Sequence, residues 1–330
     1  MVIRTKLNIE PSPDKIELKS SVVTIGSCFA QNIYSMLRTN KFKIYQNPFG
    51  PLYNPVSISQ LLNSSINNLT LDTSLFINRD DKYVHYQYHS DFNGHNTEEL
   101  HNLYNQYNNA LKDQLVKSNW LIVTLGSAST FRHTDYDVVV ANCHKQSSNQ
   151  FERSMLSIDQ IVEVLSQSFD SLLEINDTLK IILTVSPVRH VRDNLVANSL
   201  SKARLISACH ELSSQSSSID YFPSYEIMVD DLRDYRYYKE DLIHPNETAL
   251  GYIYNLFQER YFGLGLKERL AEIRKIKSGI DHRPFNPHSE KYHNFLSNLI
   301  DKCKSLEERE NLDYTEEKTT LENRLRDLTS

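Results

Sequence analysis

Short runs of aliphatic residues alternate with helical patterns along roughly the first 260 residues of the chain. The runs lack the polar alternation of half-exposed strands, which is typical of strands buried on both faces of a parallel sheet. Gly26 and Gly126 each end such a run. The pattern therefore predicts an α/β fold with a five-stranded parallel sheet. We expect strands near residues 22–26, 42–49, 121–126, 180–188 and 220–228, with helices near 29–38, 54–63, 157–174 and 199–214.

Two stretches depart from this pattern. Residues 76–89 alternate polar and aromatic side chains, and residues 131–143 carry a polar turn between apolar flanks. Both favour antiparallel hairpins, so we expect hairpin insertions at about 70–95 and 130–145. Charges of both signs and thinly spaced leucines dominate the end of the chain. We therefore expect a main domain over residues 1–265 and a charged helical C-terminal extension over 266–330.

Composition narrows the class of protein. The 330 residues are 39% hydrophobic and 24% charged, and no apolar run approaches the roughly 18 residues of a membrane span. The net charge is −6 with dispersed basic residues, which argues against a nucleic-acid partner. The beginning of the chain lacks the apolar segment of a secretory signal. Four widely spaced cysteines argue against a disulfide framework, so we expect a cytoplasmic protein.

Ser27 is the first residue that indicates chemistry. It lies between the strand that ends at Gly26 and a helix that begins at once. A serine at a helix N-terminus is close to unpaired N–H groups, which stabilise developing negative charge. The alternative is purely structural, because serine is also a favoured N-cap residue.

A second element lies after the last predicted strand, where Asp241 precedes His244 by three residues. In this spacing a carboxylate can orient the imidazole while the other ring nitrogen faces a hydroxyl. In an open parallel sheet the loops that follow the strands all emerge at one edge. We therefore expect Ser27, Asp241 and His244 to converge on that edge.

At this point the chain resembles the GSCFA-domain family of the SGNH/GDSL-like hydrolase superfamily. The resemblance covers residues from about 5 to 262. It rests on Gly-Ser-Cys-Phe-Ala at 26–30, Asn-Pro-Phe-Gly at 47–50, Thr-Leu-Gly at 124–126, Asn-Cys-His-Lys at 142–145, Ser-Pro-Val-Arg-His at 186–190 and Asp-x-x-His at 241–244.

The resemblance implies a fold and a set of roles. The fold is a three-layer α/β/α sandwich of flavodoxin-like order. Ser27 is the implied nucleophile, His244 the general base and Asp241 its partner. The backbone N–H groups of Ser27 and Gly50 are the implied oxyanion donors.

One position departs from the superfamily pattern, in which the third block ends Gly-x-Asn and the amide completes the oxyanion hole. Here the block reads Gly126-Ser127-Ala128, so that donor is missing. Asn142, on the return of the second hairpin, is our candidate replacement, because a side-chain amide can donate to an oxyanion. An ordinary turn asparagine is the alternative.

Several residues are candidates for substrate binding. His144 follows Asn142 on the same hairpin, and Arg189 and His190 leave the fourth strand at the active edge. Cys28 is an alternative nucleophile, because thiols at helix N-termini are acidified. A small cysteine turned toward the sheet is the commoner outcome.

Metal and cofactor sites are not indicated. His85, His89, His95 and His101 lack a carboxylate or cysteine of suitable spacing, and a solvated hairpin explains them. A Gly-Leu-Gly sequence at 263–265 follows a helix and lacks the third glycine of a dinucleotide site. We expect no metal and no cofactor.

The implied function is a serine esterase that removes O-acyl groups, above all O-acetyl groups, from a carbohydrate or related ester. One alternative is an O-acyltransferase that moves the acyl group to a glycan hydroxyl. The other is a binding or assembly module that keeps the fold without turnover. The expected partners are an ester substrate and, through the C-terminal extension, a second copy or another protein.

Overall fold

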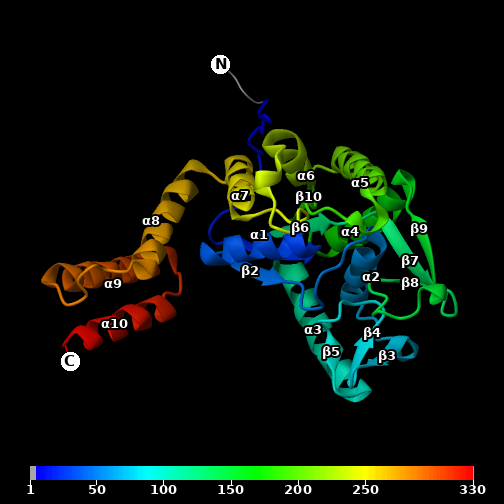
Figure 1. The fold of residues 1–330 in the computed structure, drawn as a ribbon, viewed down its shortest axis with the longest axis horizontal. Helices are drawn as coiled ribbons and strands as arrows, with labels where there is room; N and C mark the ends of the chain where they lie inside the picture. The colour runs from blue at the N-terminus through cyan, green and yellow to red at the C-terminus, as the bar shows by residue number, and fades with distance from the viewer. Residues whose placement is uncertain (1–4, 330) are drawn as a thin grey trace.

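The structure, a computed structural model, describes residues 5–329. Its centre is a parallel sheet of five strands in the order β11-β10-β6-β1-β2. Helices cover both faces, so the predicted three-layer α/β/α sandwich is confirmed (Figure 1). The strands are β1 (Ser21–Gly26), β2 (Lys43–Gln46), β6 (Trp120–Leu125), β10 (Lys180–Val185) and β11 (Ile219–Phe222).

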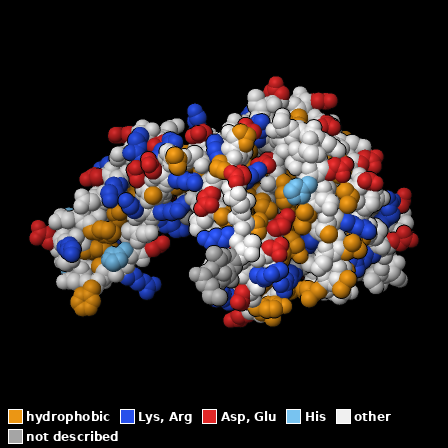
Figure 2. Space-filling model, turned by 90° about the horizontal axis from the view of Figure 1, so that it is seen from above, with side chains coloured by type: hydrophobic (Ala, Val, Ile, Leu, Met, Phe, Trp, Pro, Cys, Tyr) orange, Lys and Arg blue, Asp and Glu red, His pale blue; other side chains and the backbone are white. Residues whose placement is uncertain are grey.

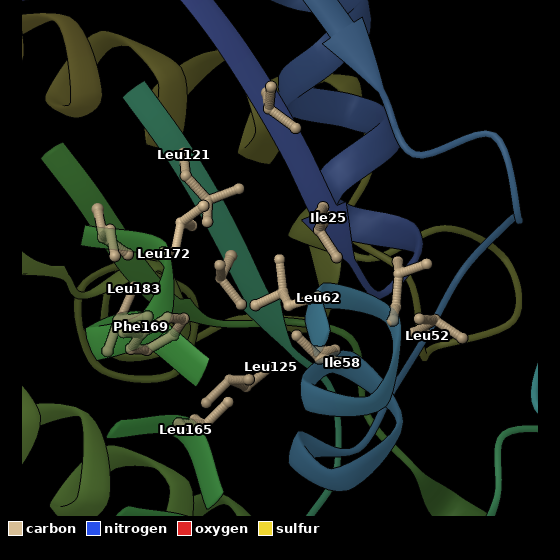
Figure 3. Close-up of a cluster of buried hydrophobic side chains, with 14 of the residues drawn as sticks. Ile25, Leu52, Ile58, Leu62, Leu121, Leu125, Leu165, Phe169, Leu172 and Leu183 are labelled. Atoms are coloured by element: carbon tan, nitrogen blue, oxygen red, sulfur yellow. The ribbon is translucent and has the colours of Figure 1, made fainter. Parts of the chain in front are cut away.

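Alternate residues of each buried strand face opposite layers. One layer consists of α2 (Pro55–Ile66), α3 (Thr97–Lys117), α4 (Ile158–Ile175) and α5 (Leu195–Gln215). Ile25, Leu121 and Leu183 point into it and meet side chains of α2 and α4 (Figure 3). The other layer consists of α1 (Cys28–Thr39) and α7 (Glu247–Tyr261), which cover the opposite face of the strands.

Three strands are shorter than their sequence patterns predict. β10 was expected to reach residue 188 but ends at Val185, just before Ser186–Pro187, where proline has no N–H for a sheet partner. β2 ends at Gln46, just before the Asn47–Pro48 turn. β11 ends at Phe222, because Pro223 has no N–H for a sheet partner and the chain turns into α6 (Ser224–Glu226). The helix α3 was not predicted, since abundant Asn and Gln on its exposed face mask the apolar stripe that it buries.

Each insertion forms a three-stranded antiparallel sheet. The first contains β3 (Phe76–Arg79), β4 (Lys82–His85) and β5 (Asn93–Gly94). The second contains β7 (Ser129–His133), β8 (Val138–Val140) and β9 (Phe151–Met155), so it extends beyond the hairpin expected near 130–145. The two sheets share a small cluster that includes Leu75, Tyr86 and Val140.

The C-terminal helices are α8 (Leu264–Asp281), α9 (Glu290–Glu310) and α10 (Thr315–Thr329). They form a group beside the sheet, on the side opposite to β7–β9 (Figure 1). Lys and Arg side chains mix with Asp and Glu over this group (Figure 2). Several of its leucines are nevertheless buried, among them Leu306 at 3% and Leu321 at 0% exposure, and they belong to the same apolar cluster as α1 and α7. No helix in the described part of the chain combines the length and apolar character needed to cross a membrane.

Candidate functional site

Gly26 fixes the turn that presents Ser27. Its φ is +127°, and a Cβ built there would lie 2.1 Å from the carbonyl oxygen of Thr124, so only glycine allows β1 and β6 to approach so closely. Ser27 then occupies the N-cap position of α1, yet its side chain makes no capping hydrogen bond. Its Oγ lies 3.1 Å from Thr124 Oγ1 instead. The hydroxyl is therefore not used as a helix cap.

The loop before α7 holds Asp241 and His244 as a pair. Leu242, between them, has a φ of +58°, which turns the chain sharply enough for the two side chains to meet. His244 Nδ1 lies 2.7 Å from Asp241 Oδ2, so Nδ1–H donates to the carboxylate and Nε2 keeps its lone pair. The backbone N–H groups of His244 and Ile243 also donate to this carboxylate and lower the pKa of Asp241 to about 2.

A pocket of about 360 Å³ lies at the carboxyl ends of β1, β6 and β10, a volume typical of small-molecule sites. Both Ser27 and His244 line it, although no hydrogen bond joins these two side chains, both of which the structure describes. Catalytic hydrogen bonds are often unformed before substrate binds. The lining residues are Ser27, Cys28, Tyr53, Asn54, Ser127, Ser129, Phe131, Val140, Ala141, Ser186, Val188, Arg189, His190, Arg192, Ile243 and His244.

Arg189 and His190 reach the pocket from the loop after β10. The guanidinium of Arg189 lies 4.3 Å from the ring centroid of Tyr238, and its backbone N–H donates to Ile243 O. The His190 ring packs edge-on against Tyr53 with a centroid separation of 5.6 Å. Burial, together with the charges of Lys202 and His244, lowers the pKa of His190 to about 4. His190 is therefore a neutral ring near pH 7.

Lys202 of α5 contacts the backbone of the pocket-lining residue Ser186 and is only 1% exposed. Its Nζ donates to the carbonyl oxygens of Gly126 and Ser186, at 2.8 and 2.7 Å. These carbonyls belong to the two loops that follow β6 and β10, so one amine ties both loops together. Burial lowers the pKa of Lys202 to about 7.

Four residues proposed for the site from the sequence lie outside the pocket lining. Asp241 is paired with the lining residue His244, and the other three are Asn142, His144 and Gly50. Asn142 Nδ2 donates to Ser90 Oγ, and its Oδ1 accepts from the backbone N–H of His144. His144 is 1% exposed and its Nε2 lies 2.9 Å from His85 O. Gly50, with a φ of +80°, lies against the His89 ring. The Ser27 N–H donates to Thr124 O at 3.0 Å.

Cys28 lines the pocket beside Ser27, and its Sγ lies 3.0 Å from the Tyr53 hydroxyl. Burial and this contact raise the pKa of Tyr53. All four cysteines of the chain are free. Among the side chains that the structure describes, no three of His, Cys, Asp or Glu are grouped so as to hold a metal ion.

Sequence reasoning missed several residues of this region, of which four bear on the chemistry. Tyr53 and Asn54 follow the second strand, so their place on the active edge was a usable signal. Arg192 lies three residues beyond Arg189 and could have been found in the same way. Nothing in the pattern of α5 marks Lys202 as buried, because a lysine on an amphipathic helix is normally exposed.

Two protein-family models match parts of this chain. No curated protein matches the chain. The sequence model of the GSCFA family matches residues 21–257, which contain Asp241 and every residue of the pocket lining, Ser27 and His244 included. A second model, described as the C-terminal domain of GSCFA domain proteins, matches residues 273–327, which cover most of α8 to α10. A match over more than half of the chain shows that this protein belongs to the GSCFA family.

Proposed function

We propose that this protein is an SGNH-like serine hydrolase or acyltransferase that forms an acyl-enzyme on Ser27. The observation that carries the proposal is the pocket itself, where a serine hydroxyl free of capping contacts shares one cavity with His244, whose ring Asp241 orients from outside the lining. Serine, histidine and aspartate in these roles are the requirements of nucleophilic acyl transfer.

In the proposed reaction, His244 Nε2 removes the proton of Ser27 Oγ as Oγ attacks the ester carbonyl carbon. The tetrahedral intermediate collapses when the C–O bond to the alcohol breaks, and His244 returns the proton to the departing oxygen. A water or a second alcohol then attacks the acyl-enzyme with His244 as base, and Ser27 recovers its proton. Asp241 stabilises the imidazolium that forms in each half-reaction.

The oxyanion requires donors that remain free at the pocket. The Ser27 N–H already has an acceptor in Thr124 O, whereas the first turn of any helix leaves N–H groups without helical partners. Asn54 lines the pocket and donates to Ser57 Oγ at 3.0 Å, and a primary amide has a second N–H to offer. We assign the oxyanion donors to the first turn of α1 and the Asn54 amide.

The proposed substrate is an O-acyl ester, with O-acetylated carbohydrate as the expectation from the superfamily resemblance. Hydrolase and transferase differ only in whether water or an alcohol resolves the acyl-enzyme. The 42% exposure of the His244 side chain supports access by either acceptor. Four free cysteines support a reducing compartment such as the cytoplasm.

A fluorophosphonate probe tests the proposal, because it labels only an activated serine. We expect labelling at Ser27 that is lost in Ser27→Ala and in His244→Ala. Each variant should lower kcat/KM for a short 4-nitrophenyl ester by about 10⁴-fold or more, and the double variant should be little worse, because the two residues act as a unit. Asp241→Asn should be milder. A folded wild-type protein that the probe does not label would favour the binding module instead.

A further inference from the structure

Two arginines on one wall give the pocket a positive character that the chain as a whole lacks. Arg189 and Arg192 both line it, while the net charge of the chain is −6. Among the described residues of the lining, none is Asp or Glu. His190, the other basic side chain from this loop, is neutral near pH 7 because burial lowers its pKa to about 4.

The two guanidiniums are oriented by aromatic rings. Arg189 lies over the Tyr238 and Tyr235 rings, at 4.3 and 5.2 Å from their centroids. Arg192 lies 5.9 Å from the centroid of Phe131, a pocket-lining residue of β7. Stacking on a ring face leaves the in-plane N–H groups of a guanidinium available for other acceptors.

Neither guanidinium has a carboxylate partner among the side chains that the structure describes. The Arg189 guanidinium donates a long hydrogen bond from Nη1 to the Tyr235 hydroxyl at 3.5 Å and also interacts with the Tyr238 side chain. A guanidinium has five N–H donors, and the contacts that the structure describes use few of those of Arg189 and Arg192. An arginine that lines a pocket with free N–H donors can bind two carboxylate or phosphate oxygens at once through its planar guanidinium.

We propose that Arg189 and Arg192 bind an anionic group of the substrate, a carboxylate or a phosphate, next to the ester that Ser27 attacks. This assignment rests on the proposed function and names the substrate class of the same site. An ester of a neutral sugar would offer neither guanidinium a charged group.

Binding of three small ligands of equal chain length tests the proposal without requiring turnover. Calorimetry compares hexan-1-ol, hexanoate and hexyl phosphate on the wild-type protein, on Arg189→Gln/Arg192→Gln and on Arg192→Gln alone. We expect at least one anion to bind about tenfold or more tightly than the alcohol, as charged hydrogen bonds allow. The preference should fall in both variants, weaken at high salt and survive in Arg192→Lys. The relative affinity of the two anions distinguishes a carboxylate substrate from a phosphate substrate.

Arg132→Gln is the matched control. Arg132 lies on the same insertion as Phe131 but pairs with Asp137 and does not line the pocket. The Arg132→Gln variant should therefore keep the wild-type preference for anions over hexan-1-ol. The single Arg192→Gln variant changes an exposed side chain and keeps the test valid if the double variant fails to fold. Equal affinity for alcohol and anions, or an anion preference that survives loss of both arginines, would overturn the proposal.

The fluorophosphonate probe separates this inference from the proposed function. If Ser27 is labelled but the anions bind no better than hexan-1-ol, only the substrate class is withdrawn. If binding of the anions requires Arg189 and Arg192 but the probe never labels Ser27, the pocket binds anions and the proposed acyl-enzyme chemistry is withdrawn.

Discussion

At the scale of single residues, Asn54 combines two roles that one substitution separates. Its Oδ1 accepts from Ser57 N and so caps α2, while its amide faces the pocket as a proposed oxyanion donor. Serine also caps helices but carries no amide, so Asn54→Ser should preserve the fold. We expect kcat to fall roughly 10²- to 10³-fold with little change in KM, because the lost hydrogen bond forms only as charge develops.

Asn142→Ala is the comparison for this measurement. Its amide is held by Ser90 in the structure, so we expect a loss in kcat below tenfold. A large loss in Asn142→Ala with little loss in Asn54→Ser would restore Asn142 as the donor expected from the sequence.

Lys202 makes a prediction about stability. Its amine donates to the two carbonyl acceptors of Gly126 and Ser186. Lys202→Met removes both donors and should destabilise the fold by about 1–3 kcal/mol for each carbonyl left without a partner. Urea unfolding measures this loss, and a destabilisation no larger than that of Lys180→Met, at a half-exposed lysine, would contradict it.

The same lysine sets a pH dependence with a definite sign. Burial lowers the pKa of Lys202 to about 7 from its ordinary value of 10.5, so between these values the unfolded chain binds the proton that the folded chain has released. Stability therefore rises with pH over this window. The difference in unfolding free energy between wild type and Lys202→Met should increase from pH 7 to pH 10. A constant difference would show that Lys202 stays protonated in the folded protein.

At the scale of elements, the first insertion depends on a buried neutral histidine. The Nε2 of His85 lies 2.9 Å from Asp72 O, and Nδ1 accepts from Gln87 N, so both ring nitrogens are used by the uncharged form. Burial lowers the pKa of His85 to about 4 from 6.5. The stability due to this ring is complete above pH 6.5 and is lost as the pH falls toward 4.

Hydrogen exchange in β3 and β4 measures this effect. We expect protection there to fall between pH 6.5 and pH 4, after correction for the intrinsic exchange rate, and the fall to be smaller in His85→Gln. His95→Gln, at an exposed histidine of the same region, should behave as the wild type. An equal fall in all three proteins would assign the acid sensitivity to other groups.

The elements also show how far sequence reasoning reaches. Buried strands such as β1 and β6 are predictable because an unbroken aliphatic run has few alternatives, and the edge on which Ser27 and His244 lie follows from parallel topology. The surroundings of Asn142 are not predictable, because Ser90 comes from the other insertion and only tertiary packing brings the two together. Lys202 escaped prediction for the same reason, since its acceptors lie on loops after β6 and β10.

At the scale of the whole molecule, the helices α8 to α10 join the main domain through α1. Lys41, just beyond α1, pairs with Glu317 and donates to Asp313 O, while Arg274 of α8 contacts Asn40 and Gln258. The N-terminal end of α1 therefore lies at Ser27, and its C-terminal end contacts the C-terminal helices.

Deletion of residues 284–330 removes α9 and α10 and tests this connection. We expect the sheet to remain folded and Ser27 to remain reactive toward the probe, because no pocket residue lies in these helices. The melting temperature should fall by several degrees, since the apolar face of α8 that includes Ile273 and Ile276 becomes exposed. Loss of labelling in a folded truncated protein would place these helices in the function of the site.

The pocket draws its proposed bond-making groups and much of its wall from different parts of the chain. Ser27 lies at the junction of β1 and α1 and His244 on the loop before α7, whereas Phe131 and Val140 belong to an inserted sheet and Arg192 to the loop after β10. Mutational diversity confined to residues 129–140 and 189–192 would therefore sample new substrates while the attacking serine and its base stay in place. In evolutionary terms, such a protein can change its substrate specificity while it keeps its catalytic chemistry.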